Sequence, residues 1–292
     1  MHDIPQTLEG LFAAYLAEKR VEHATSTHNQ LRLFFAALVK HFGNVPLSEV
    51  TTEVLRSWKI LVANTYARGT VYRRMYVLAA ALRYAVECGW LTVNPMDRIK
   101  KPSPGPGRIR FLSEQERRRL LMACKLSRSP ILYPLVVLAL GTGGRKNELR
   151  WLRWANVDLE AGSVRFTQTK THLDRTVPVV GAALQVFHAR AQQRQADTDL
   201  VFARPDGRKP WNMEHAWITA RHVAEMDDFR FHDLRHTYAS YLAMSGSSLR
   251  DIAELLGHKR IQQTMAYAHL IPSHTRPLVE RMVGQFLTCE DV

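Results

Sequence analysis

Apolar residues recur every three or four positions through most of the chain, the spacing of one buried helix face. In the first hundred residues this pattern predicts four helices, over LFAAYLAEK, THNQLRLFFAALVKHFG, EVLRSWKILV and VYRRMYVLAAALRYAVECG. Thr27 and Gln30 form a capping pattern for the second of these helices, and Gly43 is expected to end it. Gly89 is expected to end the fourth. We therefore predict a small helical bundle over residues 1–97.

A segment rich in proline and glycine interrupts this helical pattern. Three prolines and two glycines lie between residues 102 and 107, and they cannot continue a helix. Five basic residues and no acid lie between Arg98 and Arg110. A capping box formed by Ser113 and Glu116 predicts a new helix just afterwards. We interpret residues 98–112 as a basic linker, which either lies along a phosphate backbone or is simply solvated.

The pattern changes once more in the second half of the chain. QERRRLLMAC and PILYPLVVLALGTG have helical spacing, and the second of these is apolar enough to be buried. In SVRFTQTKTHLDRTVPVV, two runs with β-branched residues flank the polar THLD, which predicts a β-hairpin. Further helices are expected up to the C-terminus. The fold class predicted is mainly α with a small β-sheet (α+β), in two domains, 1–97 and 113–292.

Charge and composition narrow the function. Lys and Arg total 40 against 27 Asp and Glu, a formal net charge of +13, which predicts attraction to a polyanion such as nucleic acid. The 3 cysteines have no paired spacing, so neither a disulfide framework nor a cysteine zinc site is expected. The longest apolar stretch, residues 131–140, is too short to span a bilayer, and the N-terminus has no secretory pattern. These features favour a cytoplasmic protein.

One short motif, FHDLRHTYAS, gathers two histidines and an arginine within five positions. His232 and Arg235 share a helix face, and His236 follows His232 by one turn. The two histidines could suit zinc, but a cationic arginine on the same face would repel a metal ion. A phosphate suits histidine and arginine better, because a guanidinium pairs with it through two hydrogen bonds.

Two further motifs are ambiguous when taken singly. In GTGGRKNEL, Arg145 and Glu148 share a helix face, either as a surface ion pair or as part of a site that the glycines leave open. In LLGHKRIQQTMAYAHL, His258 precedes Tyr267 by nine residues. The alanines on either side of Tyr267 would leave an accessible phenol, whereas the alternative is a tyrosine packed in the core.

Taken in order, TGGRKNEL, QTKTHLDRTVPV, HDLRHTYAS, LLGH and TMAYAHL resemble the motifs of the tyrosine site-specific recombinases, also called phage integrases. Each motif is weak alone, but the ordered set with the spacing from His258 to Tyr267 is specific. The segment ARGTVYRRMYVLAAALRYAVECGWLTVNP also resembles the end of that family's helical core-binding domain. The resemblance covers nearly the whole chain.

The resemblance implies an enzyme that cleaves and rejoins DNA through a 3′-phosphotyrosine, in integration, excision, inversion or resolution. Tyr267 would be the nucleophile. Arg145 and Arg235 would stabilise the transition state, since preorganised donors are often the largest catalytic contribution. His232 and His258 would bind the phosphate and help to move protons, and Lys170 would protonate the leaving 5′-oxygen. Glu148 would orient the arginine site.

The resemblance also implies the partners. Double-stranded DNA is the expected substrate, with four protomers in the synapse and a chain that can be monomeric without DNA. No cofactor, metal or membrane is expected, and the site of action would be the nucleoid of a bacterial cytoplasm. The basic residues expected to contact DNA are Arg73, Arg74, Lys100, Lys101, Arg108 and Arg110.

Three other functions stay open. A DNA-binding regulator could carry this fold without catalysis, although all six catalytic residue types are present. A type IB topoisomerase shares the chemistry, although the small helical N-terminal region and the LLGH context favour a recombinase. A zinc hydrolase is a distant further alternative.

Overall fold

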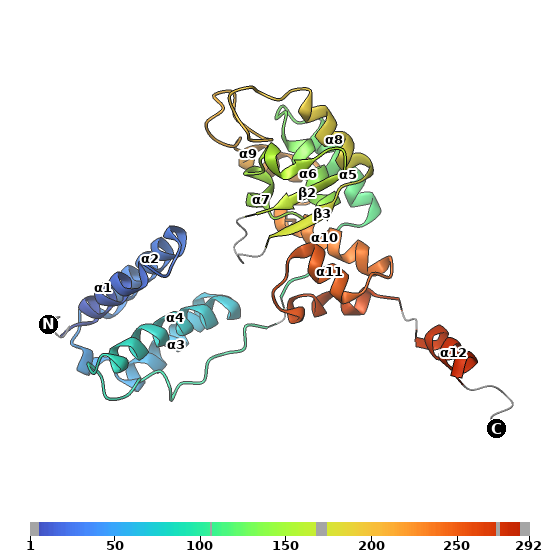
Figure 1. Cartoon of the computed structure of the whole chain (residues 1–292). Helices are drawn as coiled ribbons and strands as arrows, with labels where there is room; N and C mark the ends of the chain where they lie inside the picture. The colour runs from blue at the N-terminus through green and yellow to red at the C-terminus, as the bar shows by residue number, and fades with distance from the viewer. Residues whose placement is uncertain (1–5, 106, 168–173, 273–274, 287–292) are drawn as a thin grey trace. The chain divides into compact units, whose positions relative to one another are not determined.

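The computed structural model describes residues 6–105, 107–167, 174–272 and 275–286 (Figure 1). The contacts between residues divide the chain into two compact units, Met1–Pro106 and Gly107–Val292. Each unit has a hydrophobic core of its own. The two units are therefore described one at a time.

The first unit is helical, as predicted. Its elements are α1 (Leu8–Lys19), α2 (Thr25–Phe42), the 3-10 turn η1 (Leu47–Glu49), α3 (Thr52–Thr65) and α4 (Arg68–Glu87). Aromatic rings join three of these helices, because Phe12 of α1 stacks on Phe35 of α2 with ring centroids 4.2 Å apart. Tyr15 meets both Phe35 and Tyr84 of α4 edge-on. Offset and edge-on pairs of this kind are the favoured aromatic contacts in a core.

The start of α2 differs from the prediction. The helix begins at Thr25, two residues before the predicted cap at Thr27, and its N-cap Ala24 makes no side-chain cap bond. The His28 ring instead lies 3.2 Å from the Leu16 carbonyl oxygen of α1. Packing against α1 therefore fixes the first turn, in place of a cap. The predicted end is confirmed, since Gly43 follows the last residue of α2 with φ 78°.

The predicted linker range overlaps both cores at its ends. The buried Asn94 side chain donates to the Ala79 carbonyl at 3.0 Å and accepts from the Met96 amide at 2.9 Å, which ties the end of the bundle to α4. Ile99 is 4% exposed in the first core, and Leu112 is fully buried in the second. Residues 100–111 are therefore the stretch that joins the cores.

The second unit is mainly helical with a small sheet, as predicted. Its helices are α5 (Glu114–Lys125), α6 (Leu132–Thr142), α7 (Lys146–Arg150), α8 (Gly181–Ala191), α9 (Glu214–Val223), α10 (Phe231–Met244), α11 (Leu249–Leu256) and α12 (Thr275–Phe286). The 3-10 turns η2 (Trp154–Asn156), η3 (Ile261–Gln263) and η4 (Met265–Leu270) complete it. The predicted capping box at Ser113 and Glu116 begins α5.

Helix α6 is the centre of this unit. It packs against α5, α8 and α10, and most of its residues are buried (Figure 1). Gly143 ends the helix in the left-handed conformation, with φ 63°. A Cβ atom there would lie 2.5 Å from a ring carbon of Tyr238, so both the backbone angle and the space require glycine. The glycine-rich motif therefore lets α10 approach the end of α6 closely.

The predicted hairpin is an antiparallel pair. Strands β1 (Val157–Asp158), β2 (Ser163–Phe166) and β3 (Arg175–Pro178) form a sheet in the order β1-β2-β3. Val164 pairs with Val177, and Phe166 pairs with Arg175. Side chains alternate between the core and solvent, yet Arg175 falls on the buried face. Residues 168–173, which join β2 to β3, lie outside the described residues.

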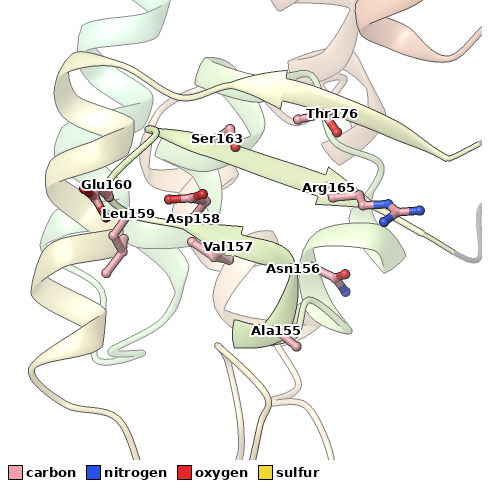
Figure 2. Close-up of a pocket in the computed structure, with 9 residues that line it drawn as sticks. All are labelled: Ala155, Asn156, Val157, Asp158, Leu159, Glu160, Ser163, Arg165 and Thr176. Atoms are coloured by element: carbon pink, nitrogen blue, oxygen red, sulfur yellow. The ribbon is translucent and has the colours of Figure 1, made fainter.

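A surface pocket of about 590 Å³ lies against this sheet, lined by residues 155–160, Ser163, Arg165 and Thr176. Figure 2 shows its lining side chains along all three strands and the turn after β1. Arg145, His232, Arg235, His258 and Tyr267, which the sequence assigns to the catalytic site, do not line this pocket. No helix in the described part of the chain is long and apolar enough to cross a membrane.

Candidate active site

Arg145 and Glu148 hold each other at the start of α7. Arg145 is the N-cap residue, and its backbone N–H donates to Glu148 Oε2 at 2.9 Å. Its guanidinium Nη1 donates to Glu148 Oε1 at 2.6 Å. One carboxylate thus caps the helix and orients the arginine, which confirms the predicted shared face. The α7 turn follows directly from the glycines at the end of α6.

A second arginine, Arg175 of β3, holds the same carboxylate and was missed by the sequence analysis. Its Nη2 and Nη1 donate to Glu148 Oε2 and Oε1 at 2.7 and 3.2 Å. Its Nε donates to the Leu255 carbonyl at 2.9 Å, and its guanidinium carbon lies 4.5 Å from the centre of the Phe166 ring. Arg175 therefore joins the sheet to α7 and to the end of α11. The available signal was an arginine at an inward-facing position of the predicted strand.

Glu148 is a buried anion between these two cations. Burial disfavours its charged form, but the hydrogen bonds and charge of Arg175, and then of Arg145, outweigh this and lower its pKa to about 2. The Glu148 and Arg175 side chains are only 6% and 5% exposed. Glu148 is therefore ionised at neutral pH.

Arg235 of α10 is a buried cation. Its Nη1 donates to the Gly143 carbonyl at 2.8 Å, and its Nη2 donates to the Leu256 carbonyl. Burial lowers its pKa to about 9, and the charges of Arg145 and Arg175 act in the same direction. The guanidinium stays protonated at neutral pH. Its two bonds connect α10 to the end of α6 and the end of α11.

His258 follows the left-handed Gly257 that ends α11. Its Nδ1 lies 2.8 Å from the hydroxyl of Thr264, which is fully buried. Burial lowers the pKa of His258 to about 4, and the charges of Arg235 and Arg145 contribute. The ring is therefore neutral at neutral pH, and its contact with the Thr264 hydroxyl through Nδ1 fixes its position.

His232 stands at the start of α10 with its side chain exposed. Loss of hydration on the side facing the protein lowers its pKa, and the neighbouring charges of Arg235 and Arg145 add to the effect. Its ring lies 5.1 Å from the ring of His236, centroid to centroid. His232 therefore belongs to the same cluster as Arg235, as their shared face predicted.

Tyr267 lies on η4 and is only 3% exposed. Its hydroxyl oxygen is 2.6 Å from Nδ1 of His236. Burial raises its pKa to about 12, although the charge of Arg235 opposes this. Of the two alternatives that the sequence left open for Tyr267, the structure has the tyrosine packed in the core, because η4 packs against α10 and places the ring among buried side chains.

These residues converge on one place in the second unit, where α7, α10, α11, β3 and η4 meet. The charges of Arg145 and Arg235 act on both His232 and His258, and Arg235 acts on Tyr267. Three arginines and one carboxylate give the cluster a formal charge of +2. Lys170 lies outside the described residues.

The basic residues that were expected to contact DNA lie in two settings. In the first unit, Arg73 is exposed on α4, and the Arg74 guanidinium lies 3.8 Å from the Tyr66 ring centroid. Both line an open groove of about 750 Å³ between α2 and α4. Lys100 is exposed and Lys101 is half-buried.

The other two arginines, Arg108 and Arg110, belong to the second unit and already have acidic partners. Arg108 donates to the Asp228 carboxylate at 2.8 Å, and Arg110 pairs with Glu116. Their charge is therefore partly neutralised within the protein.

Residues 110–274 match the model of the phage integrase family. The chain belongs to this family. The match includes every residue of the charged cluster, which agrees with the predicted family and fold class. The integrase of Salmonella phage P22 is 32% identical over 66% of this chain and 52% of its own length. The integrase of Haemophilus phage HP1 is 31% identical over 65% and 52%. The chain spans about half the length of these two relatives.

Other relatives match over greater length. The tyrosine recombinase XerA of Pyrococcus furiosus is 26% identical over 92% of each chain. Among solved structures, the Tn1549 transposon integrase in complex with a circular intermediate DNA has a TM-score of 0.77 at 17% identity, covering 97% of this chain and 100% of that one. A lambda integrase tetramer bound to a Holliday junction has a TM-score of 0.74 at 18% identity, covering 90% and 80%. These structures share the fold of the chain.

Proposed function

We propose that this integrase-family chain is a site-specific DNA recombinase that cleaves and rejoins strands through a 3′-phosphotyrosine. One observation carries the proposal: a tyrosine hydroxyl is buried beside a preorganised cluster of charge +2. A phosphodiester is an anion, and attack on it adds negative charge to its non-bridging oxygens. Fixed donors that stabilise such charge are often the largest catalytic contribution.

The proposed reaction exchanges one phosphodiester for another. The Tyr267 oxygen bonds to phosphorus, the bond from phosphorus to the 5′-oxygen breaks, and the 5′-hydroxyl leaves with a proton. Arg145 and Arg235 stabilise the non-bridging oxygens, and neutral His258 and His232 donate hydrogen bonds to them. Lys170 supplies the proton to the 5′-oxygen. A 5′-hydroxyl of the partner strand reverses these steps, so no external energy source is needed.

The substrate we propose is double-stranded DNA. The net charge of +13 and the arginines beside the groove between α2 and α4 support DNA contact by the first unit. Relatives of the same fold have been solved on DNA, one of them as a tetramer on a Holliday junction. We propose the same tetrameric assembly on synapsed DNA for this chain, acting in the bacterial cytoplasm at the nucleoid.

The direct test is to trap the covalent intermediate. The wild-type chain is expressed in bacterial cells and denatured with detergent, and the DNA that stays attached is sequenced. The protein is then digested, and mass spectrometry finds the residue that carries the nucleotide. We expect a few discrete DNA sites and the remnant on Tyr267. Tight DNA binding without any adduct would instead support a DNA-binding regulator that does not catalyse cleavage. A nucleotide remnant on another residue would contradict the assignment of Tyr267 as the nucleophile.

Arg235→Lys should lower the rate of strand cleavage by about 100-fold or more, because one amine cannot replace the guanidinium that bonds two carbonyls and faces the phosphate charge. Single-turnover cleavage of a site found by the trapping experiment measures the effect. Arg119→Lys is a suitable control, since Arg119 is an exposed arginine of α5 near Glu225. Equal cleavage rates for Arg235→Lys and wild type would exclude Arg235 from the catalytic site.

Arg73→Ala should weaken DNA binding and reduce the slope of log affinity against log salt by about 1, because one phosphate contact is lost. Fluorescence anisotropy of a labelled duplex across a salt series measures both quantities. Arg83→Ala serves as the control on the same helix, where the arginine lies 3.8 Å from Asp97. If Arg83→Ala changes the slope and Arg73→Ala does not, DNA does not follow the groove between α2 and α4.

A further inference from the structure

His236 contacts the oxygen that would attack phosphorus. Its Nδ1 lies 2.6 Å from the Tyr267 hydroxyl, which is well within hydrogen-bond range. Tyr267 is 3% exposed, so water does not readily replace this partner. His258 differs, because its Nδ1 is occupied by the Thr264 hydroxyl at 2.8 Å. Of the histidines in the described site, His236 is therefore the one in contact with the nucleophile.

The proposed cleavage also leaves one proton without a destination. The tyrosine loses its proton as its oxygen bonds to phosphorus, while the proton gained by the 5′-oxygen comes from the opposite side of the reacting phosphate. We propose that His236 is a catalytic residue that orients the Tyr267 hydroxyl and accepts its proton through Nδ1 during attack. This inference rests on the function proposed above.

The surroundings of His236 keep its ring neutral, so that it can accept a proton. Burial lowers its pKa to about 4, so the ring is neutral at neutral pH and has a free lone pair on one nitrogen. The charged and titratable groups that interact with the ring include His232, Asp233 and Arg235 on its own helix, Arg108 from the segment before α5, His258 after α11, and Tyr267 from η4. Asp233 is the acid in this set and favours the protonated ring.

The pKa values of Tyr267 and His236 indicate when the proton moves relative to the attack on phosphorus. Burial raises the pKa of Tyr267 to about 12 and lowers that of His236 to about 4, so proton transfer before attack is strongly unfavourable. Transfer must therefore accompany formation of the bond between oxygen and phosphorus, which makes the phenol oxygen far more acidic. The negative phosphate also favours a protonated histidine beside it. The proton returns to the tyrosine oxygen when the 5′-hydroxyl of a partner strand attacks.

The test compares variants that separate orientation from proton transfer. In His236→Asn the side-chain amide keeps a hydrogen-bonding group near the position of Nδ1, but it cannot take a proton. His236→Ala removes both functions. Single-turnover cleavage is measured with a saturating duplex that contains a trapped site, and thermal unfolding shows whether each variant is folded. We expect both variants to lose roughly 100-fold or more in cleavage rate.

A second substrate distinguishes a defect in removing the proton from the nucleophile from a defect in protonating the leaving group. Sulfur in place of the bridging 5′-oxygen gives a leaving group that needs no proton. Lys170→Ala should recover on this substrate, whereas His236→Asn should stay slow, because its defect lies on the side of the nucleophile. Cleavage by His236→Asn at the wild-type rate, or its recovery on the sulfur substrate, would overturn the proposal for His236.

These outcomes are distinct from failure of the proposed function. If the wild type formed no covalent product on either substrate, both proposals would fall together. If the wild type cleaved and Tyr267→Phe did not, only the rates of the His236 variants would decide the role of His236. Should His236→Ala fail to fold, His236→Asn and His236→Gln still provide the comparison.

Discussion

Tyr267→Phe is expected to abolish covalent attachment to DNA and strand exchange completely. The substitution removes one oxygen atom, and that oxygen is the only atom of the side chain able to form an ester with phosphorus. The ring itself stays packed among the buried residues around α10. Nδ1 of His236 loses its partner, which costs about 1 kcal/mol of stability. The variant should therefore fold and bind DNA while forming no adduct.

The matched control is Tyr241→Phe. Tyr241 is a partly buried residue of α10, and its hydroxyl donates to the Leu112 carbonyl at 2.9 Å. Both variants lose one tyrosine hydroxyl and one hydrogen bond, but only one of these hydroxyls lies in the charged cluster. Gel separation of protein–DNA adducts under denaturing conditions measures the difference. Adduct formation by Tyr267→Phe at the level of Tyr241→Phe would mean that another residue is the nucleophile.

The helices could be predicted from the sequence because their signals are local. Periodic apolar residues, the Ser113 capping box and the terminal glycines all act within a few residues of the elements they define. The beginning of α2 could not, because its first turn depends on His28 packing against the distant Leu16 carbonyl. Tertiary contacts of this kind leave no local pattern in the sequence.

The candidate site likewise contains some contacts that are local in the sequence and others between distant residues. Arg145 with Glu148, and His232 with Arg235, could be paired because each pair is separated by one helical turn. Arg175 is 27 residues from Glu148, and His236 is 31 residues from Tyr267. The fold brings these partners together, since Arg175 links β3 to α7 through Glu148 and η4 packs against α10. The burial of Tyr267 follows from the packing of η4 against α10, which is why the flanking alanines alone could not decide between an accessible and a packed tyrosine.

Burial also explains why glycines occur beside the site residues. A Cβ atom on Gly257 would lie 3.0 Å from Cδ of Arg175, and one on Gly144 would lie 2.9 Å from Leu149 and Phe166 side-chain atoms. The motifs GTGGR and LLGH thus combine a residue that we propose to be catalytic with the small residue that lets its neighbours approach. The sequence shows that both are present, but the close contacts emerge only in the folded chain.

Glu148→Gln should cause the largest loss of stability among these substitutions, about 3–5 kcal/mol in the free energy of unfolding. Glutamine has the same shape but no charge, so Arg175 becomes a buried cation without its anion, and Arg145 loses the group that orients it. Cleavage should fall as well. Glu116→Gln is the control, because the pKa of Glu116 is also about 2 through Arg110, yet that pair lies at the start of α5. It should lose less stability and cleave normally.

The pH dependence of Glu148→Gln provides an independent check. The pKa of Glu148 is about 2 in the folded chain and near the ordinary glutamate value of 4.5 when unfolded, so the unfolded chain binds more protons between these values. The stability that Glu148 contributes is therefore complete above about pH 5 and is lost as the pH falls toward 2. Glutamine does not titrate, so the stability gap between wild type and Glu148→Gln should narrow by about 2 kcal/mol from pH 6 to pH 3. Denaturant unfolding at each pH measures the gap. A constant gap would mean that Glu148 is not an ionised anion between two arginines, and the charge of +2 that we assign to the cluster would then be incorrect.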